Sequence, residues 1–527
     1  MTTYIIGPGQ TYETFTALEA AVVLAGDDIV DGGLNSYTDT WTPASSGTSG
    51  HLIELKNATI VADGDRCIYS LNRSFLNVHD IIGSSAAVVV FYFRGATSYT
   101  ASDLTAYGTQ GMYLRDIDNF TLDGYTVSAG VDGLYNQETT TISSDMSLSN
   151  VTMFDLSGYG MFFSGVVGGY ADGLTLSAIS FNNVVNPLYF TYTRDITGSN
   201  ISTTNGGAIQ LTNVTTGVFT NVSNSNCAGV GFAVDSSSGI TVNTLNLATT
   251  VSNAVYLLDS TNVTINGGTV VAAGTDAVHL SGTTSGCILT KLIVKNSRAT
   301  DSAHADAFTS HVGCSDNTFK FNLTYNNRNT SHAHTGDAAG AIYHNTSIND
   351  GDIAINTRAA FSVTSTGVMV CRNNLTYNNE SYPIAATITG NAVDADYNAY
   401  ISNLAAPFMF DTAAGKTFTE WISYVGGETN SWFIHEIGDG TWKWYKGGDP
   451  TTLVQTTTYC PVTAAGKLVD KTDNLLIDGG VRVAGVNDGT ETDLAGHKMY
   501  GLPPIGVYEV VPGAQLRNGY GVSRWGR

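Results

Sequence analysis

Ala208-Ile209-Gln210-Leu211 is the first of four similar segments in this chain; the others are Gly231-Phe232-Ala233-Val234, Ala254-Val255-Tyr256-Leu257 and Ala277-Val278-His279-Leu280. Their second residues follow one another at intervals of 23 positions. A fixed period in the low twenties that carries short alternating strands is typical of a solenoid, whose coils bury a core only when they stack. Alternation places Ile209 and Leu211 on one face, which is predicted to be the core, and Gln210 on the other. The same holds for the corresponding residues of the other three segments.

Two kinds of solenoid have this period. A leucine-rich repeat would show a Leu-x-x-Leu-x-Leu pattern and a helical return. Here the apolar positions mix Val, Ile, Phe and Leu, and the residues between them are mostly Gly, Ser, Thr and Asn. This composition disfavours helices and suits strands joined by tight turns. The sequence therefore predicts an all-β fold, a right-handed parallel β-helix solenoid.

The bulk composition limits the partners of the chain. It has 527 residues, a formal net charge of −22 and only 23 Lys and Arg residues, with no basic cluster, so we expect no nucleic-acid partner. The N-terminus lacks a basic segment and a long apolar run, so no signal peptide is predicted. The longest apolar stretch, 86–93, is too short to cross a bilayer, and no membrane insertion is expected. The six Cys are widely spread and are expected to be free, buried thiols.

Three regions follow one another along the chain. Residues 1–45 are predicted to form an N-terminal cap with a helix, because Tyr12, Phe15, Leu18 and Val22 recur at helical spacing. Residues 46–400 are predicted to form the β-helix. Asn in its turn segments, such as Asn119, Asn150 and Asn262, suits left-handed corners and hydrogen-bonded ladders better than glycosylation.

Residues 401–527 are predicted to be a small C-terminal β and irregular region. A short helix is expected at 417–426 and a hairpin within 430–446. The tryptophans of this hairpin, Trp442 and Trp444, are predicted substrate-binding residues that stack on sugar rings; the alternative is that they plug the last coil. The polar tail Gly513–Arg527 is expected to be buried in a homotrimer or a larger protein assembly.

Most histidines fall in one window, where the period also lengthens. His279, His304, His311, His332, His334 and His344 account for six of the ten. Val278, Phe308 and Ile342 are separated by more than one normal period, and insertions in a solenoid map to loops on one face. Counting along the strands makes His279, Thr309 and Tyr343 equivalent outward positions of three coils. It also places Asp276 and Asp306 as an acidic pair at one corner.

This window is predicted to carry the functional site in one surface groove. The candidate catalytic residues are His311, Tyr343, Arg328 and Asp306. The candidate substrate-binding residues, besides the two tryptophans, are His279, His304, His344 and Lys320. His332, His334 and Asp337 are candidate ligands of a divalent cation. A uronic-acid lyase would use a cation and a base, an inverting hydrolase would use two carboxylates, and a polar loop without chemistry is the third alternative.

Both ends of the chain resemble one family. The opening "GPGQTYETFTALEAAVVLAGDDIVDGG" and the closing "DADYNAYIS", "TFTEWISYVGGETNS" and "DLAGHKMYGLPPIGVYEV" are similar to right-handed parallel β-helix repeat proteins of the pectate-lyase-like and phage-tailspike-like type. The resemblance implies the β-helix fold and leaves several functions open. We expect a virion-surface, tailspike-like protein that binds bacterial polysaccharide, and the resemblance leaves open whether it also cleaves that polysaccharide. The alternatives are a non-catalytic structural subunit and a secreted polysaccharide lyase or epimerase.

Overall fold

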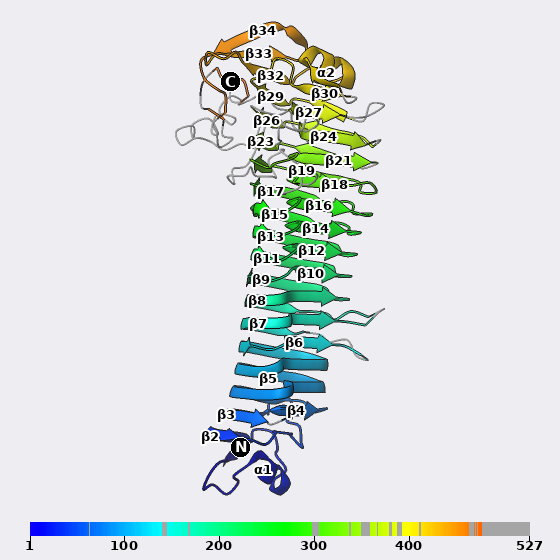
Figure 1. Cartoon of the computed structure of the whole chain (residues 1–527). Coiled ribbons are helices and arrows are strands. Elements are labelled where there is room, and N and C mark those ends of the chain that lie inside the picture. The colour runs from blue at the N-terminus through cyan, green and yellow to red at the C-terminus, as the bar shows by residue number, and fades with distance from the viewer. Residues whose placement is uncertain are drawn as a thin grey trace, which may run out of the picture. The chain divides into compact units, whose positions relative to one another are not determined.

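The computed structural model confirms an all-β parallel β-helix solenoid (Figure 1). It describes residues 1–62, 64–139, 145–166, 169–297, 305–336, 339–348, 359–365, 367–378, 382–386, 393–410, 413–462, 468–469, 471 and 473–476. The chain forms two compact units, unit 1 (Met1–Asn246) and unit 2 (Leu247–Arg527), and each is described by itself. The predicted interface segment Gly513–Arg527 lies outside the described residues.

Unit 1 begins with one helix, α1 (Phe15–Ala21), and otherwise consists of strands. The strands are β1 (Thr3–Ile5), β2 (Ile29–Tyr37), β3 (Ile53–Ala62), β4 (Ile68–Leu71), β5 (Leu76–Ser128), β6 (Asp132–Gln137), β7 (Ser147–Ser164), β8 (Thr175–Thr191), β9 (Arg194–Thr204), β10 (Ile209–Thr212), β11 (Thr215–Cys227), β12 (Phe232–Asp235) and β13 (Ser238–Thr250), the last of which runs into unit 2.

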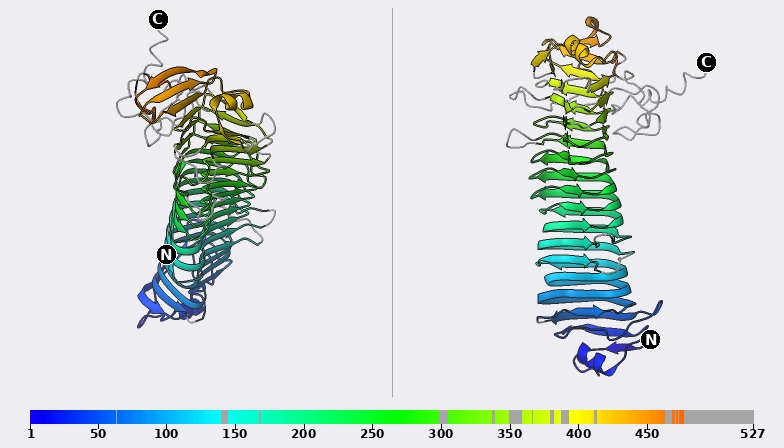
Figure 2. Two further views of the ribbon diagram at one scale, coloured as in Figure 1. Left: turned by 45° about the horizontal axis from the view of Figure 1, so that its top comes forward. Right: turned by 90° about the vertical axis from the view of Figure 1, so that its right-hand side faces the viewer.

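The predicted core of the repeats is confirmed within unit 1. Strand β10 pairs in parallel with β12, so that Ile209 lies opposite Phe232 and both are fully buried. The strands of successive coils pair in the same way (Figure 2). The corners are also as expected, because Asn119 and Asn150 adopt a positive φ of 53° and 54°.

The N-terminal cap is shorter in its helical part than the sequence predicts. Thr14 caps α1, since its side chain accepts a hydrogen bond from the Ala17 amide, and only Phe15 and Leu18 of this helix are buried. Tyr12 therefore precedes the helix, and Val22 ends it in an extended conformation. The two buried side chains close the first coil, which would otherwise expose its core.

Unit 2 contains the shorter strands and the helix α2 (Phe418–Val425). Its strands are β14 (Val255–Leu258), β15 (Thr264–Ala273), β16 (Val278–Ser281), β17 (Ile288–Lys295), β18 (Phe308–Ser310), β19 (Asn317–Lys320), β20 (Leu323–Tyr325), β21 (His332–Gly336), β22 (Gly340–Tyr343), β23 (Thr346–Ile348), β24 (Ala359–Ser365), β25 (Met369–Arg372), β26 (Leu375–Asn378), β27 (Tyr382–Ala386), β28 (Val393–Asp396), β29 (Ala399–Ser402), β30 (Phe408–Phe410), β31 (Ala413–Lys416), β32 (Trp432–Glu436), β33 (Trp442–Lys446) and β34 (Asp449–Thr457).

Three parallel ladders run through unit 2. One contains β16, β18, β21, β24, β27 and β30; the second contains β17, β19, β22, β25 and β28; the third contains β17, β20, β23, β26, β29 and β32. Strand β17 serves two ladders because it bends at a corner, where Lys291 has a positive φ. Val255 lies opposite Val278, and both are buried, which confirms the predicted core positions in this unit.

One corner of unit 2 holds a buried ladder of asparagines. The backbone N–H groups of Asn322, Asn345 and Asn374 each donate to the side-chain Oδ1 atom of the asparagine one coil further on, at 2.9, 3.0 and 2.9 Å. The Nδ2 atoms of Asn345 and Asn374 donate back to the carbonyls of Phe319 and Ile342. The expectation that asparagines stack into hydrogen-bonded ladders is thus confirmed inside the core.

The C-terminal part of unit 2 contains the predicted helix and hairpin. Thr417 and Glu420 form a capping box at the start of α2, and Gly426 ends it in the left-handed conformation. Strands β32 and β33 pair antiparallel.

All six cysteines are free, and five are buried while Cys460 is half-buried, as expected for isolated thiols. Among the described residues, no helix is both long and apolar enough to span a bilayer.

The asparagine ladder gives a test of what holds unit 2 together. Asn345→Ala leaves the buried Asn322 amide and Phe319 carbonyl without their partner, and each such group costs about 1–3 kcal/mol. We expect the free energy of unfolding of unit 2 to fall by roughly 2–5 kcal/mol in urea titrations. Asn403→Ala is the control, because Asn403 lies in the same unit and is exposed. Equal effects of the two substitutions would contradict the role assigned to the ladder.

Candidate functional site

The first candidate site lies on the outward side of β16 in unit 2. Alternation buries Val278 and Leu280 and turns His279 outward. The carboxylate of Asp276, which precedes the strand, is almost fully buried, and its Oδ2 atom lies 2.8 Å from Nδ1 of His279. A buried carboxylate thus fixes the orientation of an imidazole whose side chain remains 16% exposed.

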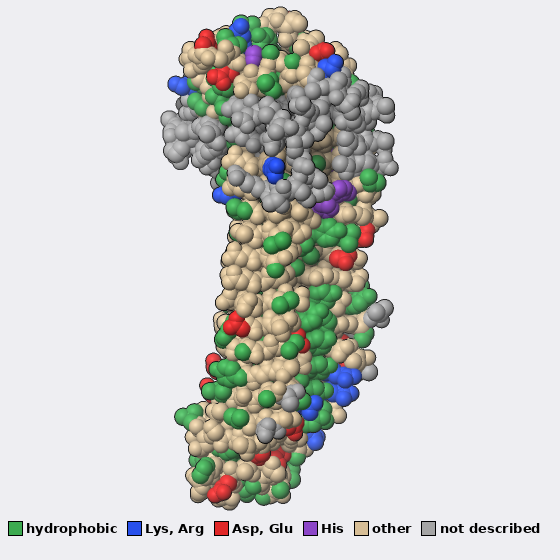
Figure 3. All heavy atoms as spheres, viewed as in Figure 1, with side chains coloured by type: hydrophobic (Ala, Val, Ile, Leu, Met, Phe, Trp, Pro, Cys, Tyr) green, Lys and Arg blue, Asp and Glu red, His purple; other side chains and the backbone are tan. Residues whose placement is uncertain are grey.

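Two further rings adjoin this imidazole. Tyr256 is in register with His279 on the neighbouring strand β14, and their ring centroids are 5.3 Å apart. The chain leaves β18 at Ser310, and the ring of His311 then lies 4.5 Å from that of His279. Figure 3 shows His side chains gathered at one place on the surface of this unit. The structure therefore brings together two of the predicted histidines, His279 and His311.

The predicted acidic pair is also present. The Asp306 amide donates to Oδ1 of Asp276 at 3.1 Å, and the Asp306 carboxylate accepts from the Thr330 amide at 2.7 Å. Burial, and then the charge of Asp276, raises the pKa of Asp306 to about 7. Neither carboxylate forms an ion pair with a Lys or Arg among the described residues. Both are too buried to act on a polymer directly, so the imidazoles are the accessible groups.

Asp276, His279 and His311 are the described residues that could hold a metal ion. One oxygen of the aspartate and one nitrogen of each histidine all lie within 4.8 Å of one another. This set of ligands was not predicted from the sequence, where the three residues had separate roles. The signal was an Asp-x-x-His spacing ahead of a lengthened interval between strands.

Tyr343 does not belong to this site, and its predicted register is wrong. Thr309 is in register with His279, as predicted, but the next residue in that ladder is Ala333. Tyr343 instead lies between Lys320 and Arg372 in the second ladder of unit 2. The error arose because β21 is a separate strand of the lengthened coil, so that counting from one hydrophobic segment to the next skipped it.

The single groove expected from the sequence is therefore corrected. Lys320 is only 7% exposed, and His344 is buried at a corner, where its ring stacks on Phe321 and it bonds Asn373. Arg328 lies in the turn after β20, where its amide donates to the Ser297 carbonyl. Of the four candidate catalytic residues, Asp306 and His311 lie at the Asp276–His279 site. His304 lies outside the described residues.

His332 and His334 point into the core, contrary to their predicted place at a surface metal site. The ring of His332 stacks between Phe308 and Phe361, with centroids 4.8 and 5.2 Å away, and His334 packs edge-on against Phe319. Burial lowers the pKa of His332 far below its ordinary value and that of His334 to about 3. Both are thus neutral core residues, and the third predicted ligand, Asp337, lies outside the described residues.

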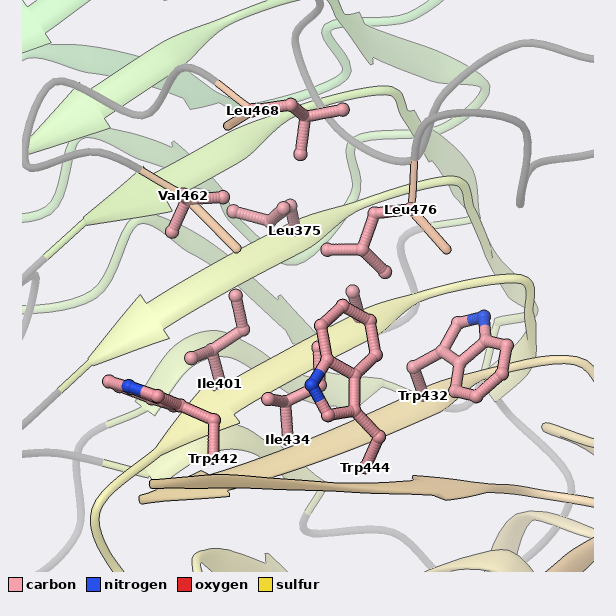
Figure 4. Packing of buried hydrophobic residues seen from close by; sticks show 10 residues of the cluster. Leu375, Ile401, Trp432, Ile434, Trp442, Trp444, Val462, Leu468 and Leu476 are labelled. Carbon is pink, nitrogen blue, oxygen red and sulfur yellow. The ribbon is translucent and has the colours of Figure 1, made fainter. Parts of the chain in front are cut away.

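Trp442 and Trp444 are also core residues rather than a sugar-binding surface. They are 5% and 0% exposed and pack with Trp432 and Ile434 at the end of unit 2 (Figure 4). The Trp444 Nε1 atom donates to Thr457 at 3.1 Å, so its polar atom is satisfied inside the core. The alternative interpretation, that these side chains plug the last coil, is correct.

A second candidate site, which sequence reasoning missed, is a column of stacked aromatic rings on unit 1. We call this column the tyrosine ladder; it consists of Tyr69, Tyr92, Tyr113, Tyr135, Phe162 and Tyr189. Successive ring centroids are 5.3, 5.2, 5.5, 4.4 and 5.4 Å apart. The rings occupy outward positions of β4 to β8 and are half-buried. The available signal was one aromatic residue per coil, each between two core residues.

Polar residues form a second outward column beside the tyrosine ladder. Residues two positions after the rings share their face of the sheet. The first of them is the apolar Leu71, and the others are polar: Arg94, Arg115, Gln137, Ser164 and Thr191. Arg94 is exposed and makes no ion pair with a described residue, whereas the Arg115 guanidinium lies 3.8 Å from the Asp116 carboxylate. Arg66 covers the rings of Tyr69 and Tyr92 at 4.5 and 4.9 Å. Figure 3 shows a hydrophobic band on this unit with Lys and Arg side chains beside it.

Comparison with known proteins gives structural neighbours only. No protein-family model matches the chain, and no curated protein is a detectable relative. The catalytic unit of a GH87 alpha-1,3-glucanase from Streptomyces thermodiastaticus aligns with a TM-score of 0.40 and 10% identity, over 56% of this chain and 62% of its own length. A pectate lyase, Pel9A, aligns with a TM-score of 0.23 and 12% identity, over 95% of this chain and 97% of its own length.

Tailspike protein 3 of bacteriophage CBA120 aligns with a TM-score of 0.27 and 12% identity, over 78% of this chain and 56% of its own. The neighbours thus include a pectate lyase and a phage tailspike, the two types that the sequence resembles. Because identities and TM-scores are low, no activity or ligand of these proteins is transferred to the chain.

The buried imidazoles predict a pH dependence of stability. Because the pKa of His332 is lowered in the folded state, the unfolded chain binds a proton below about pH 6.5 that the folded chain does not. The free energy of unfolding should therefore fall as the pH decreases below 6.5, by about 1.4 kcal/mol per pH unit for this residue. His332→Phe should remove that part of the slope between pH 6.5 and 5, measured by urea unfolding. His51→Phe, at an exposed site, is the control, and an unchanged slope in His332→Phe would contradict the prediction.

Proposed function

We propose that this chain binds an extended polysaccharide along the tyrosine ladder of unit 1. The observation that carries the proposal is a column of six aromatic rings on outward positions of consecutive coils, in which the five rings from Tyr92 to Tyr189 stack and the Tyr69 ring is tilted by 51° to that of Tyr92. Parallel pairing repeats these positions at about 4.8 Å, so the surface is a regular line. A regular line of equivalent groups suits a linear polymer of similar units better than a compact ligand.

The chemistry of the ladder favours a sugar over other polymers. The tyrosines present apolar ring edges together with hydroxyl groups, which matches the alternation of C–H and O–H groups on a pyranose. The polar column beside the rings adds side chains that donate and accept hydrogen bonds, and the Tyr113 hydroxyl already bonds Gln137 at 2.8 Å. A formal net charge of −22 disfavours nucleic acid, because phosphates would be repelled.

Charge at the ladder favours an acidic glycan. Arg66, Arg94 and Arg115 flank the rings, although the chain has only 23 Lys and Arg residues. The Arg115 guanidinium lies 3.8 Å from the Asp116 carboxylate, which partly neutralises its charge. The exposed Arg94 is therefore the guanidinium best placed to pair with an anionic group. Planar guanidinium groups bind carboxylates and sulfates in a bidentate manner.

The proposal extends to the biological setting expected from the sequence. A tailspike-like role on a virion surface, in a homotrimer or larger assembly, would place a glycan-binding solenoid where bacterial polysaccharide is met. The observation behind this part is the similarity of both chain ends to such proteins. The molar mass of the full chain from light scattering tests the assembly, and a monomer at all concentrations would count against it.

Substitution within the ladder tests the binding proposal. Tyr113 lies between two stacked rings, so Tyr113→Ala should weaken binding of an acidic polysaccharide about 10-fold (~1.4 kcal/mol) in calorimetric titrations. Arg94→Gln should also weaken it and reduce its dependence on salt. Tyr107→Ala is the control, because Tyr107 lies in the same strand, β5, and is 47% exposed. A panel of acidic and neutral polysaccharides that shows no binding, or equal binding by all variants, would refute the proposal.

Cleavage of the glycan in unit 2 is a second candidate function. The observation that favours it is that the buried Asp276 orients His279, which is the arrangement of a general base held by a carboxylate. With an acidic glycan, the base would remove the proton next to the carboxylate, the electron pair would form a C=C bond as the glycosidic C–O bond at the β-carbon breaks, and the leaving oxygen would take up a proton. The unsaturated ends would absorb at about 235 nm. His279→Ala should abolish this absorbance, while His51→Ala should retain it. Release of saturated ends, or of none, would argue against this chemistry.

A further inference from the structure

We propose that Asp276, His279 and His311 form a binding site for a transition-metal dication of the zinc type. The site is in unit 2 and does not depend on the tyrosine ladder. It shares Asp276 and His279 with the proposed cleavage site, and zinc binding and the general-base role of His279 are alternatives, because an imidazole nitrogen bound to an ion cannot accept a proton. It consists of one carboxylate oxygen and two imidazole nitrogens, contributed by the residues that precede β16, lie on it and follow β18.

The distances between these atoms are close to those of a coordination shell. Two ligand atoms that are each about 2.1 Å from one ion can be at most about 4.2 Å apart. In this structure the three atoms lie within 4.8 Å of one another, and Oδ2 of Asp276 and Nδ1 of His279 are 2.8 Å apart. In a tetrahedral shell such atoms are about 3.4 Å apart, so closing the site shortens the longest separation by up to about 1.4 Å. His311 lies in a turn after β18 rather than within a strand, so its side chain can adjust without breaking the ladder.

Charge at the site calls for a cation. Asp276 is 1% exposed and Asp306 is 6% exposed, and their positions are coupled through the 3.1 Å hydrogen bond from the Asp306 amide. Buried carboxylates are normally paired with a cation or bound to a metal, yet neither forms an ion pair with a Lys or Arg among the described residues. A dication bound by Asp276 would supply the missing positive charge.

The surroundings hold the ligands as a metal site requires. The Asp306 amide occupies Oδ1 of Asp276, which leaves Oδ2 directed at His279. Asp306 is itself fixed by the Thr330 amide at 2.7 Å and by the Thr309 hydroxyl at 3.3 Å. Such outer contacts set the direction of a ligand and are typical of metal sites. Both imidazole side chains are half-buried, and that of His279 is 16% exposed.

The donor types decide which ion binds. Calcium and magnesium prefer oxygen ligands and larger numbers of them, whereas imidazole nitrogen suits zinc, copper, nickel and cobalt. Two nitrogens and one oxygen leave at least one coordination position open on a four-coordinate ion. That position would accept water or an anionic group of a ligand. The site is therefore expected to discriminate strongly between Zn²⁺ and Ca²⁺.

The experiment uses the untagged full chain after removal of metals with a chelator and dialysis. Titration with ZnCl₂ in a calorimeter should give one site per chain, and CaCl₂ should give none at the same concentrations. Asp276→Asn, His279→Ala and His311→Ala should each weaken zinc binding by more than about 10-fold. Co²⁺ provides a second readout, because its visible absorption bands report nitrogen and oxygen ligands and should disappear in His311→Ala.

His51→Ala is the matched control. His51 also lies 2.7 Å from a carboxylate, that of Asp27, but this pair is exposed and belongs to no group of three ligands among the described residues. The control should bind zinc as the unchanged chain does. Circular dichroism of the metal-free variants should match that of the parent, which separates loss of a ligand from loss of the fold. His311→Ala is the substitution least expected to disturb folding, because His311 lies outside the strands.

Three outcomes would overturn the proposal. They are the absence of stoichiometric zinc binding, zinc binding that all three ligand variants retain, and calcium binding as tight as zinc binding. The result does not depend on the polysaccharide proposal. Zinc binding without any glycan binding would support the metal site and refute the function of the tyrosine ladder. Glycan binding without zinc binding would refute the metal site and support the ladder.

Discussion

The structure depends on the parallel, in-register pairing of each coil with the next. Within the solenoid, strands such as β8, β10 and β19 bond their backbone to the next coil, so a residue lies directly over its counterpart there. This constraint converts a position in the repeat into a column of side chains. Inside unit 2 such a column is the asparagine ladder, and outside unit 1 it is the tyrosine ladder. The candidate binding surface and the stabilising network thus have the same geometric cause.

The sequence predicts the fold well wherever the period is regular. Ile209 and Phe232 in unit 1, and Val255 and Val278 in unit 2, are buried partners because simple counting places them in register. Left-handed corners at Asn119 and Asn150 were also predictable, since asparagine tolerates a positive φ. Local signals likewise identify α2, whose capping box is written in the sequence between Thr417 and Glu420.

The site was only partly predictable, because the period changes there. Asp276, Asp306, His279 and His311 are neighbours, and their clustering in the sequence indicated this. Tyr343 was placed in the wrong ladder, because the extra strand β21 shifts the count. His332 lies in a polar stretch of sequence that is typical of a loop. In the structure it lies on a strand, and alternation along that strand directs its ring into the core, between two phenylalanine rings. Whether a histidine faces inward depends on which residue begins the strand, and composition does not contain that information.

The tyrosine ladder has a consequence for how such a protein can change during evolution. Its rings are separated by between 21 and 27 residues along the chain, yet they stack because each interval closes one coil. A duplication of one whole coil would therefore lengthen the ladder by one ring and leave every other column in register. A duplication out of step by a single residue would turn the rings into the core and the core residues outward. Selection can thus lengthen or shorten the surface in whole coils, while insertions inside a coil are confined to its corners.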